Sequence, residues 1–206
     1  MKLTNAAVET RVESPLAIFC EARPEIKSLL LATLFGALTA LSAQVSIRLP
    51  FTPVPITGQV FMALLAGALL GPKLGALSQF EYLLLGAAGL PVFTSGGGLL
   101  ALVGPTGGYL FGFVGAAWIV GTIIRAHRGW LRTALAHLAG IGVIYLCGWL
   151  WLACWLGWHN PAGDALLKAL AFGVVPFIGI DLAKAFLASQ VISSINLGSA
   201  RLNRKN

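Results

Sequence analysis

The chain has 206 residues, of which 57% are hydrophobic and only 10% are charged, and its mean hydropathy is +0.85. Soluble domains carry about 25% charged residues, so this composition excludes an ordinary soluble protein and predicts a surface that faces lipid. The net charge of +7 does not indicate nucleic acid as a partner, because the basic residues gather on one predicted side of a membrane.

The first 28 residues are polar and contain four glutamates. A secretory signal has a basic start and a short apolar core, and this segment has neither. We therefore expect a cytoplasmic tail over residues 1–28, one membrane domain over residues 29–197, and a basic cytoplasmic tail over residues 198–206.

Six apolar segments make up the predicted membrane domain. A membrane helix needs about 20 mainly apolar residues, and only the second segment is clearly short. Residues 164–174 are expected to form a short interfacial helix that ends before Pro176. The predicted fold class is all-α integral membrane, with six transmembrane helices at Leu29–Ile47, Ile56–Leu70, Leu74–Leu90, Gly107–Ile124, Ala134–Leu156 and Pro176–Ile195.

The distribution of Lys and Arg predicts the orientation. If the N-terminus is cytoplasmic, 11 of the 14 basic residues lie inside, Arg48 and Lys168 lie outside, and Lys184 lies within the last span. Positive residues favour the cytoplasmic side, so both termini should be cytoplasmic. The three outer loops are rich in Pro, Gly or polar residues, and a site for an external ligand should lie under them.

Asp181 and Lys184 are the most informative polar residues, because they lie three positions apart in the last span. Residues with this spacing share a helix face and are close enough to pair. Charged groups at membrane depth usually face a cavity or a partner. Two interpretations remain open, a ligand site and a self-neutralising structural pair.

Three further polar residues allow similar alternatives. Glu81 lies in the third span, where it is either a ligand-binding group or a protonated carboxyl bonded between helices. Thr57 and Gln59 open the short second span, where polar groups indicate either a transporter site or a helix cap.

The first span contains a stripe of small residues, Ala32, Gly36 and Ala40. A small residue at every fourth position lets another helix approach closely. The stripe therefore predicts either internal packing or an interface with a partner subunit.

No catalytic or metal-binding pattern is present. Residues 104–108 lack the Lys of a phosphate-binding loop, and the three histidines do not have the spacing of metal ligands. We predict a binder or transporter of a small molecule. The alternative from another class is a membrane enzyme that uses Glu81 and Asp181 as acid and base.

Several motifs occur in order along residues 30–195. They are PVPITGQ at residues 53–59, LLAGALLGPKLG at 64–75, YLLLG at 82–86, GLPVF at 89–93 and GPTGGYL at 104–110, followed by Pro176-Phe177 and the Asp-x-x-Lys pair at 181 and 184. This set resembles the BioY family of biotin-binding S components in energy-coupling factor (ECF) transporters. The alternative within this class is an S component for another vitamin.

The resemblance implies that the ligand is biotin and that there is no cofactor. It further implies that biotin is held near the outer face, under loops one, three and five, which are residues 48–55, 91–106 and 157–168. It also implies two kinds of partner, a transmembrane coupling subunit and ABC-type ATPases, in a bacterial or archaeal cytoplasmic membrane. Asp181 would accept the ureido N–H groups of biotin, and Lys184 would meet its carboxylate tail or its carbonyl. The remaining expected ligand contacts are Thr57, Gln59, Glu81, Tyr82 and Tyr109.

Overall fold

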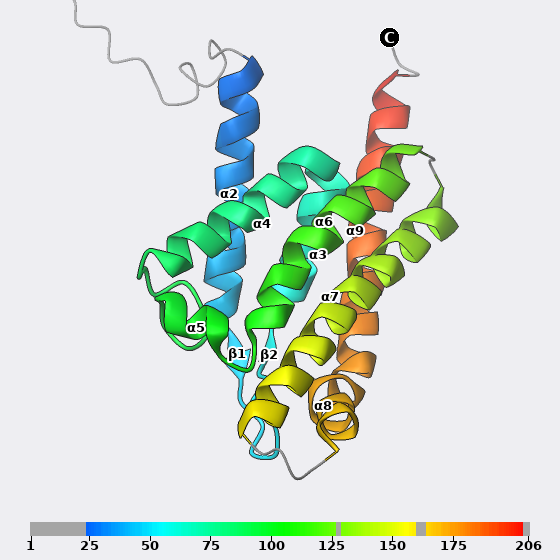
Figure 1. Ribbon diagram of the computed structural model, residues 1–206. Coiled ribbons are helices and arrows are strands. Elements are labelled where there is room, and N and C mark those ends of the chain that lie inside the picture. The colour runs from blue at the N-terminus through cyan, green and yellow to red at the C-terminus, as the bar shows by residue number, and fades with distance from the viewer. Residues whose placement is uncertain (1–23, 127–128, 160–163, 204–206) are drawn as a thin grey trace, which may run out of the picture.

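The computed structural model describes residues 24–126, 129–159 and 164–203, and most of them are helical (Figure 1). A two-stranded antiparallel sheet, β1 with β2, pairs Ser46 with Thr57. The elements are α2 (Pro24–Gln44), β1 (Ser46–Ile47), β2 (Ile56–Thr57), α3 (Gln59–Leu70), α4 (Pro72–Ala87), α5 (Leu99–Val103), α6 (Gly107–Ala126), α7 (Trp130–His159), α8 (Ala165–Gly173), the 3-10 helix η1 (Val175–Phe177) and α9 (Ile178–Asn203).

Four segments of the described chain are long and apolar enough to cross a membrane: Pro24–Gln44, Gly107–Arg125, Trp130–Trp158 and Ala165–Ile195. The second and third predicted spans correspond to α3 and α4, which have only 12 and 16 residues. Helices of this length fall below the usual span of about 17–25 residues. A domain with six membrane-crossing helices therefore stays a prediction.

The helix α3 is short because its predicted first residues belong to other structure. Ile56 and Thr57 pair with β1, and the prolines before them have no backbone N–H to donate. At its other end α3 stops at Gly71, which has a φ of +80° that favours glycine. Pro72 then begins α4 directly, in a position where its missing N–H costs nothing.

Close helix contacts build the core around α6. A Cβ on Gly112 would lie 2.9 Å from the Cα of Ile144, so α6 and α7 approach at backbone distance. On the other side of α6, a Cβ on Gly67 of α3 would overlap the backbone of Ala117. Small residues permit such contacts between membrane helices, which accounts for the abundance of glycine inside the predicted spans.

The small-residue stripe on α2 packs inside the molecule. Ala32 is fully buried, Gly36 is buried, and Ala40 is partly buried against the core. A Cβ on Gly36 would lie 2.9 Å from the carbonyl oxygen of Ser78 on α4. Within this chain the stripe therefore packs against α4, and the expectation that these three residues form an interface with a partner subunit stays a prediction.

The helix α2 begins, and α9 ends, at the same end of the bundle, while β1, β2, α5 and α8 lie at the opposite end (Figure 1). Most of the predicted N-terminal tail and the last three residues lie outside the described residues. Within the described chain, α2 begins at Pro24, five residues before the predicted span, and α9 continues to Asn203. The irregular elements are thus gathered at one end.

Candidate functional site

A cavity of about 50 Å³ lies between the irregular end and the middle of the bundle. It forms where the β2–α3 junction meets α6, α7 and the start of α9. Its lining residues are Val54, Pro55, Ile56, Thr57, Gln59, Val60, Thr94, Thr106, Tyr109, Leu110, Phe113, Ile144, Tyr145, Gly173, Phe177, Asp181 and Lys184.

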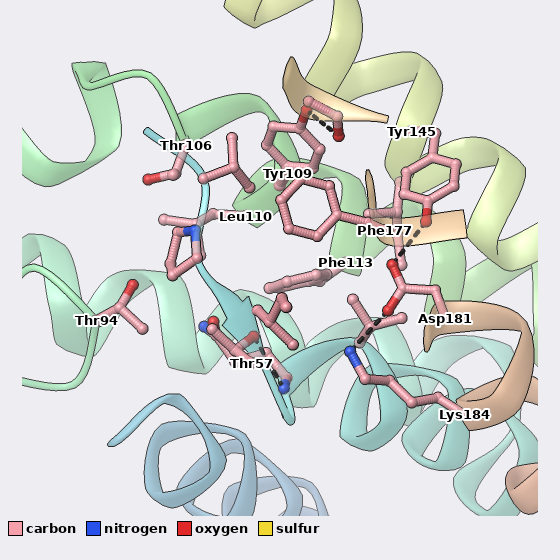
Figure 2. Close-up of a pocket in the computed structure, with 17 residues that line it drawn as sticks. Thr57, Thr94, Thr106, Tyr109, Leu110, Phe113, Tyr145, Phe177, Asp181 and Lys184 are labelled. Carbon is pink, nitrogen blue, oxygen red and sulfur yellow. Dashed lines mark hydrogen bonds and ion pairs between the residues drawn. The ribbon is translucent and has the colours of Figure 1, made fainter. Parts of the chain in front are cut away.

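One end of the cavity holds a charged cluster formed by Asp181, Lys184 and Tyr145 (Figure 2). The Nζ of Lys184 donates to Oδ1 of Asp181 at 2.7 Å, and the Tyr145 hydroxyl donates to Oδ2 at 2.8 Å. Asp181 is only 4% exposed. Each carboxylate oxygen thus has one partner within the protein, and the ion pair carries no net charge.

The break between α8 and α9 positions this cluster. Pro176 lies in η1, which separates the two helices, so that α9 begins at Ile178 and Asp181 falls in its first turn. A negative charge is favoured there by the helix dipole. Lys184 follows one turn later on the same face and neutralises Asp181.

The middle of the cavity is apolar. Leu110 and Phe113 come from α6, Ile144 from α7 and Phe177 from η1. Tyr109 stands beside them, and its hydroxyl donates to the carbonyl oxygen of Gly173 at 2.8 Å. This hydrogen bond connects α6 to the end of α8, so the wall is held in place from two sides.

The other end of the cavity carries three hydroxyl groups, from Thr57, Thr94 and Thr106, on the side opposite the charged cluster (Figure 2). The Thr57 hydroxyl lines the cavity and also accepts from the backbone N–H of Gln59, the first residue of α3, at 3.3 Å. The cavity therefore offers two polar ends separated by an apolar middle.

Five of the seven predicted ligand-binding residues line this cavity: Thr57, Gln59, Tyr109, Asp181 and Lys184. The structure also shows that the Gln59 side-chain amide already donates to the hydroxyl of Tyr82. This contact limits what the amide can offer to another molecule.

The other two predicted residues, Tyr82 and Glu81, do not line the cavity. Tyr82 is fully buried behind Gln59, and its ring stands edge to face against Phe93 with centroids 5.3 Å apart. Glu81 lies beside Gly36 of α2, and its Oε2 is buried without a hydrogen-bond partner among the described residues. Their side chains diverge because consecutive helix residues are separated by about 100° around the axis.

Tyr145, Thr94 and Thr106 are cavity residues that the sequence analysis did not single out. Tyr145 was identifiable in principle, because the chain has only three tyrosines and this one lies within a predicted span. Thr94 and Thr106 belong to the predicted outer loop at residues 91–106, in which no pattern distinguishes cavity residues from other loop residues.

The sequence model of the BioY family matches residues 11–200. The chain belongs to the BioY family. Its relatives include the probable biotin transporter BioY of Pyrococcus horikoshii, which is 46% identical over 79% of this chain and 91% of its own length. The biotin transporter BioY of Thermotoga maritima is 40% identical over 81% of this chain and 94% of its own length.

A solved structure supports the same assignment for this BioY chain. It is the crystal structure of the S component for biotin from an ECF-type ABC transporter, with a TM-score of 0.73 and 28% sequence identity. The similarity covers 84% of this chain and 92% of that protein. As a BioY protein the chain is a transporter component and not an enzyme, so the acid–base interpretation of Glu81 and Asp181 is set aside.

Proposed function

We propose that the chain is the biotin-binding S component of an ECF-type vitamin transporter, and that it holds biotin in the cavity beneath the loops at residues 48–55, 91–106 and 157–168. The observation that carries this proposal is the charged cluster of Asp181, Lys184 and Tyr145, whose ion pair has no net charge, at one end of a cavity with an apolar middle. A mainly apolar pocket with a few fixed polar groups is typical of small-molecule sites.

The chemistry of biotin fits this arrangement. Biotin has an apolar bicycle, a ureido group with two N–H donors and one carbonyl acceptor, and a carboxylate tail. A carboxylate offers roughly four lone-pair sites, and the protein occupies two of those on Asp181. The remaining sites suit the two ureido N–H groups, while the apolar wall from Leu110, Phe113 and Phe177 covers the bicycle.

A bound molecule of this size requires the cavity to widen. Its volume of about 50 Å³ is well below the roughly 300–1,000 Å³ of pockets for drug-sized ligands. The walls on α6 and η1 consist of side chains rather than backbone, so rotamer changes can create space. We therefore expect biotin to bind with movement of the apolar lining.

We further propose six transmembrane helices, with both termini on the cytoplasmic side of a bacterial or archaeal membrane, and assembly with a transmembrane coupling subunit and ABC-type ATPases. Two observations support this topology. The described start of α2 and end of α9 lie at one end of the bundle (Figure 1), and the predicted cytoplasmic side carries 11 of the 14 basic residues.

Cysteine labelling tests the topology. We expect a membrane-impermeant thiol reagent, applied from outside, to label a Ser95→Cys variant and not a Ser199→Cys variant, each made in a background without Cys20, Cys147 and Cys154. Labelling of Ser199→Cys alone would place the cavity on the cytoplasmic side and contradict uptake from outside.

Calorimetry of the purified protein tests the function directly. We expect biotin to bind, while thiamine and lipoate do not bind. The Asp181→Asn and Lys184→Met double variant should show weaker binding of biotin. Absence of biotin binding by the folded wild-type protein would refute the proposal, and binding of another vitamin instead would identify an S component for that vitamin.

A further inference from the structure

A second, wider groove adjoins the inner cavity at the irregular end of the bundle. Its volume is about 530 Å³, and it is more open than the cavity. Pro55, Thr94 and Thr106 line both spaces, so the groove and the cavity meet at these three residues. Thr94 and Thr106 lie on the side of the cavity opposite the charged cluster (Figure 2).

The groove differs from the cavity in charge. Among the described residues that line the groove, Arg48 is the only charged one, and the polar side chains beside it are the hydroxyls of Thr52, Thr94, Ser95 and Thr106. The guanidinium of Arg48 donates to the carbonyl oxygen of Thr94 at 3.2 Å, which holds it close to the junction. In the cavity, by contrast, Asp181 cancels the charge of Lys184.

We propose that the groove is the binding site for the anionic tail of the ligand, and that Arg48 binds its carboxylate. This inference rests on the proposed function and deepens it, because it fixes the orientation of biotin. The ureido group lies at Asp181 and Lys184, the bicycle lies in the apolar middle, and the tail passes Thr94 and Thr106 into the groove.

Electrostatics favour this orientation over the reverse. A ligand carboxylate at the inner end would meet the carboxylate of Asp181, and like charges disfavour each other at close range. Lys184 has its charge already satisfied there and serves as a donor to the ureido carbonyl. In the groove the guanidinium offers several N–H donors in a planar fork that matches a carboxylate.

The first experiment compares Arg48→Gln with Lys168→Gln. Lys168 is an exposed cation on α8 at the same end of the molecule and does not line the groove. For Arg48→Gln we expect biotin affinity to fall roughly threefold to tenfold, as for loss of a partly exposed charged contact. Lys168→Gln should change it less than about twofold, as expected for an isolated surface charge.

Biotin methyl ester serves as the internal control, because it lacks the tail charge. Arg48→Gln should bind the ester as the wild type does, which also shows that the variant is folded. An equal loss for biotin and the ester, or no loss for either, would overturn the assignment of Arg48. The proposed function would survive either result, since it fails only if the wild type does not bind biotin.

The second experiment tests orientation with wild-type protein. Biotin amidated with a polyethylene glycol arm should still bind, because the arm continues into the open groove. Biotin methylated on a ureido nitrogen should lose most of its affinity, because that nitrogen can no longer donate to Asp181. The opposite result, exclusion of the amide and retention of the N-methylated compound, would reverse the orientation and refute the inference.

Discussion

Two polar clusters between helices of this protein differ in whether they adjoin a cavity. Asp181, Lys184 and Tyr145 join α7 to α9 and line a cavity. The second cluster joins α2 to α4, where the Gln79 amide donates to Thr39 Oγ1 and to Ser78 Oγ, each at 3.1 Å. All three residues of this second cluster are fully buried, and none lines the cavity or the groove.

The difference shows how a functional polar group can be told from a structural one in a membrane domain. In the α2–α4 cluster the hydroxyl of Thr39 also donates to the carbonyl oxygen of Phe35, and the hydroxyl of Ser78 donates to the carbonyl oxygen of Gly75. The hydrogen-bonding groups of this cluster are thus satisfied within the protein. In the α7–α9 cluster the carboxylate keeps lone pairs that face a cavity. Unused hydrogen-bonding capacity beside open space, rather than burial or polarity alone, indicates the ligand site.

The largest effect on binding is expected from the ion pair. Losing a charged hydrogen bond costs about 1.5–3 kcal/mol, and about 1.4 kcal/mol corresponds to tenfold in affinity. Asp181→Asn or Lys184→Ala should therefore weaken biotin binding by roughly tenfold to a few hundredfold. Calorimetry and the melting temperature are measured together for both variants.

The double variant Asp181→Asn, Lys184→Met is the matched control. A purely structural pair would lose stability in each single variant and regain both stability and biotin affinity in the double variant. Full-affinity binding by the double variant would therefore remove both residues from the site and abolish the contrast between the two clusters.

An intermediate effect is expected from Tyr145→Phe. The change removes the hydroxyl that donates to Asp181 Oδ2 and keeps the ring. A net hydrogen bond is worth about 0.5–1.5 kcal/mol, so affinity should fall roughly twofold to tenfold. If Tyr145 acts by orienting Asp181, the loss should vanish in an Asp181→Asn background. Independent, multiplicative losses would contradict this positioning role.

The smallest effect on binding is expected from Gln79→Leu in the α2–α4 cluster. The change removes the hydrogen bond to Thr39 between α2 and α4, which is worth about 0.6 kcal/mol on average for membrane helices, and the hydrogen bond to Ser78 within α4. The melting temperature should therefore fall by roughly 2–4 °C. Biotin affinity should stay within about twofold. Thr122→Val removes an exposed hydroxyl bond within α6 and serves as the control. A large loss of affinity in Gln79→Leu would show that both clusters serve the site.

Much of the site was predictable because charge and spacing carry local information. Asp181 and Lys184 lie on one helix, so the sequence alone predicts that they pair. Thr57 and Gln59 follow the prolines that delay the start of α3, and their place at the cavity follows from that junction. Whether the Glu81 side chain faces the cavity or α2, by contrast, depends on how the helices pack around α4. That packing is a tertiary property, which the local sequence does not reveal.

The stripe at Ala32, Gly36 and Ala40 likewise shows that a local pattern does not identify the packing partner. Its pattern predicts a close helix contact, and the structure supplies that contact on α4 within the chain. The spacing of small residues does not distinguish a helix of the same chain from one of another subunit. Tyr145 was recognisable as a rare polar residue in a predicted span, but its contact with Asp181 requires α7 to lie beside α9, which no local pattern encodes.

Three hydrogen bonds tie together the segments over the cavity. Gln44 donates to Pro91 at 3.3 Å, Arg48 to Thr94 at 3.2 Å, and Thr52 to Phe172 at 2.6 Å. The segment that follows α2 is thus fastened to the 91–106 loop on one side and to α8 on the other. Connected segments of this kind open as one cooperative unit. Their amide hydrogens should therefore exchange with solvent at a common rate, and biotin should slow that exchange in all three together.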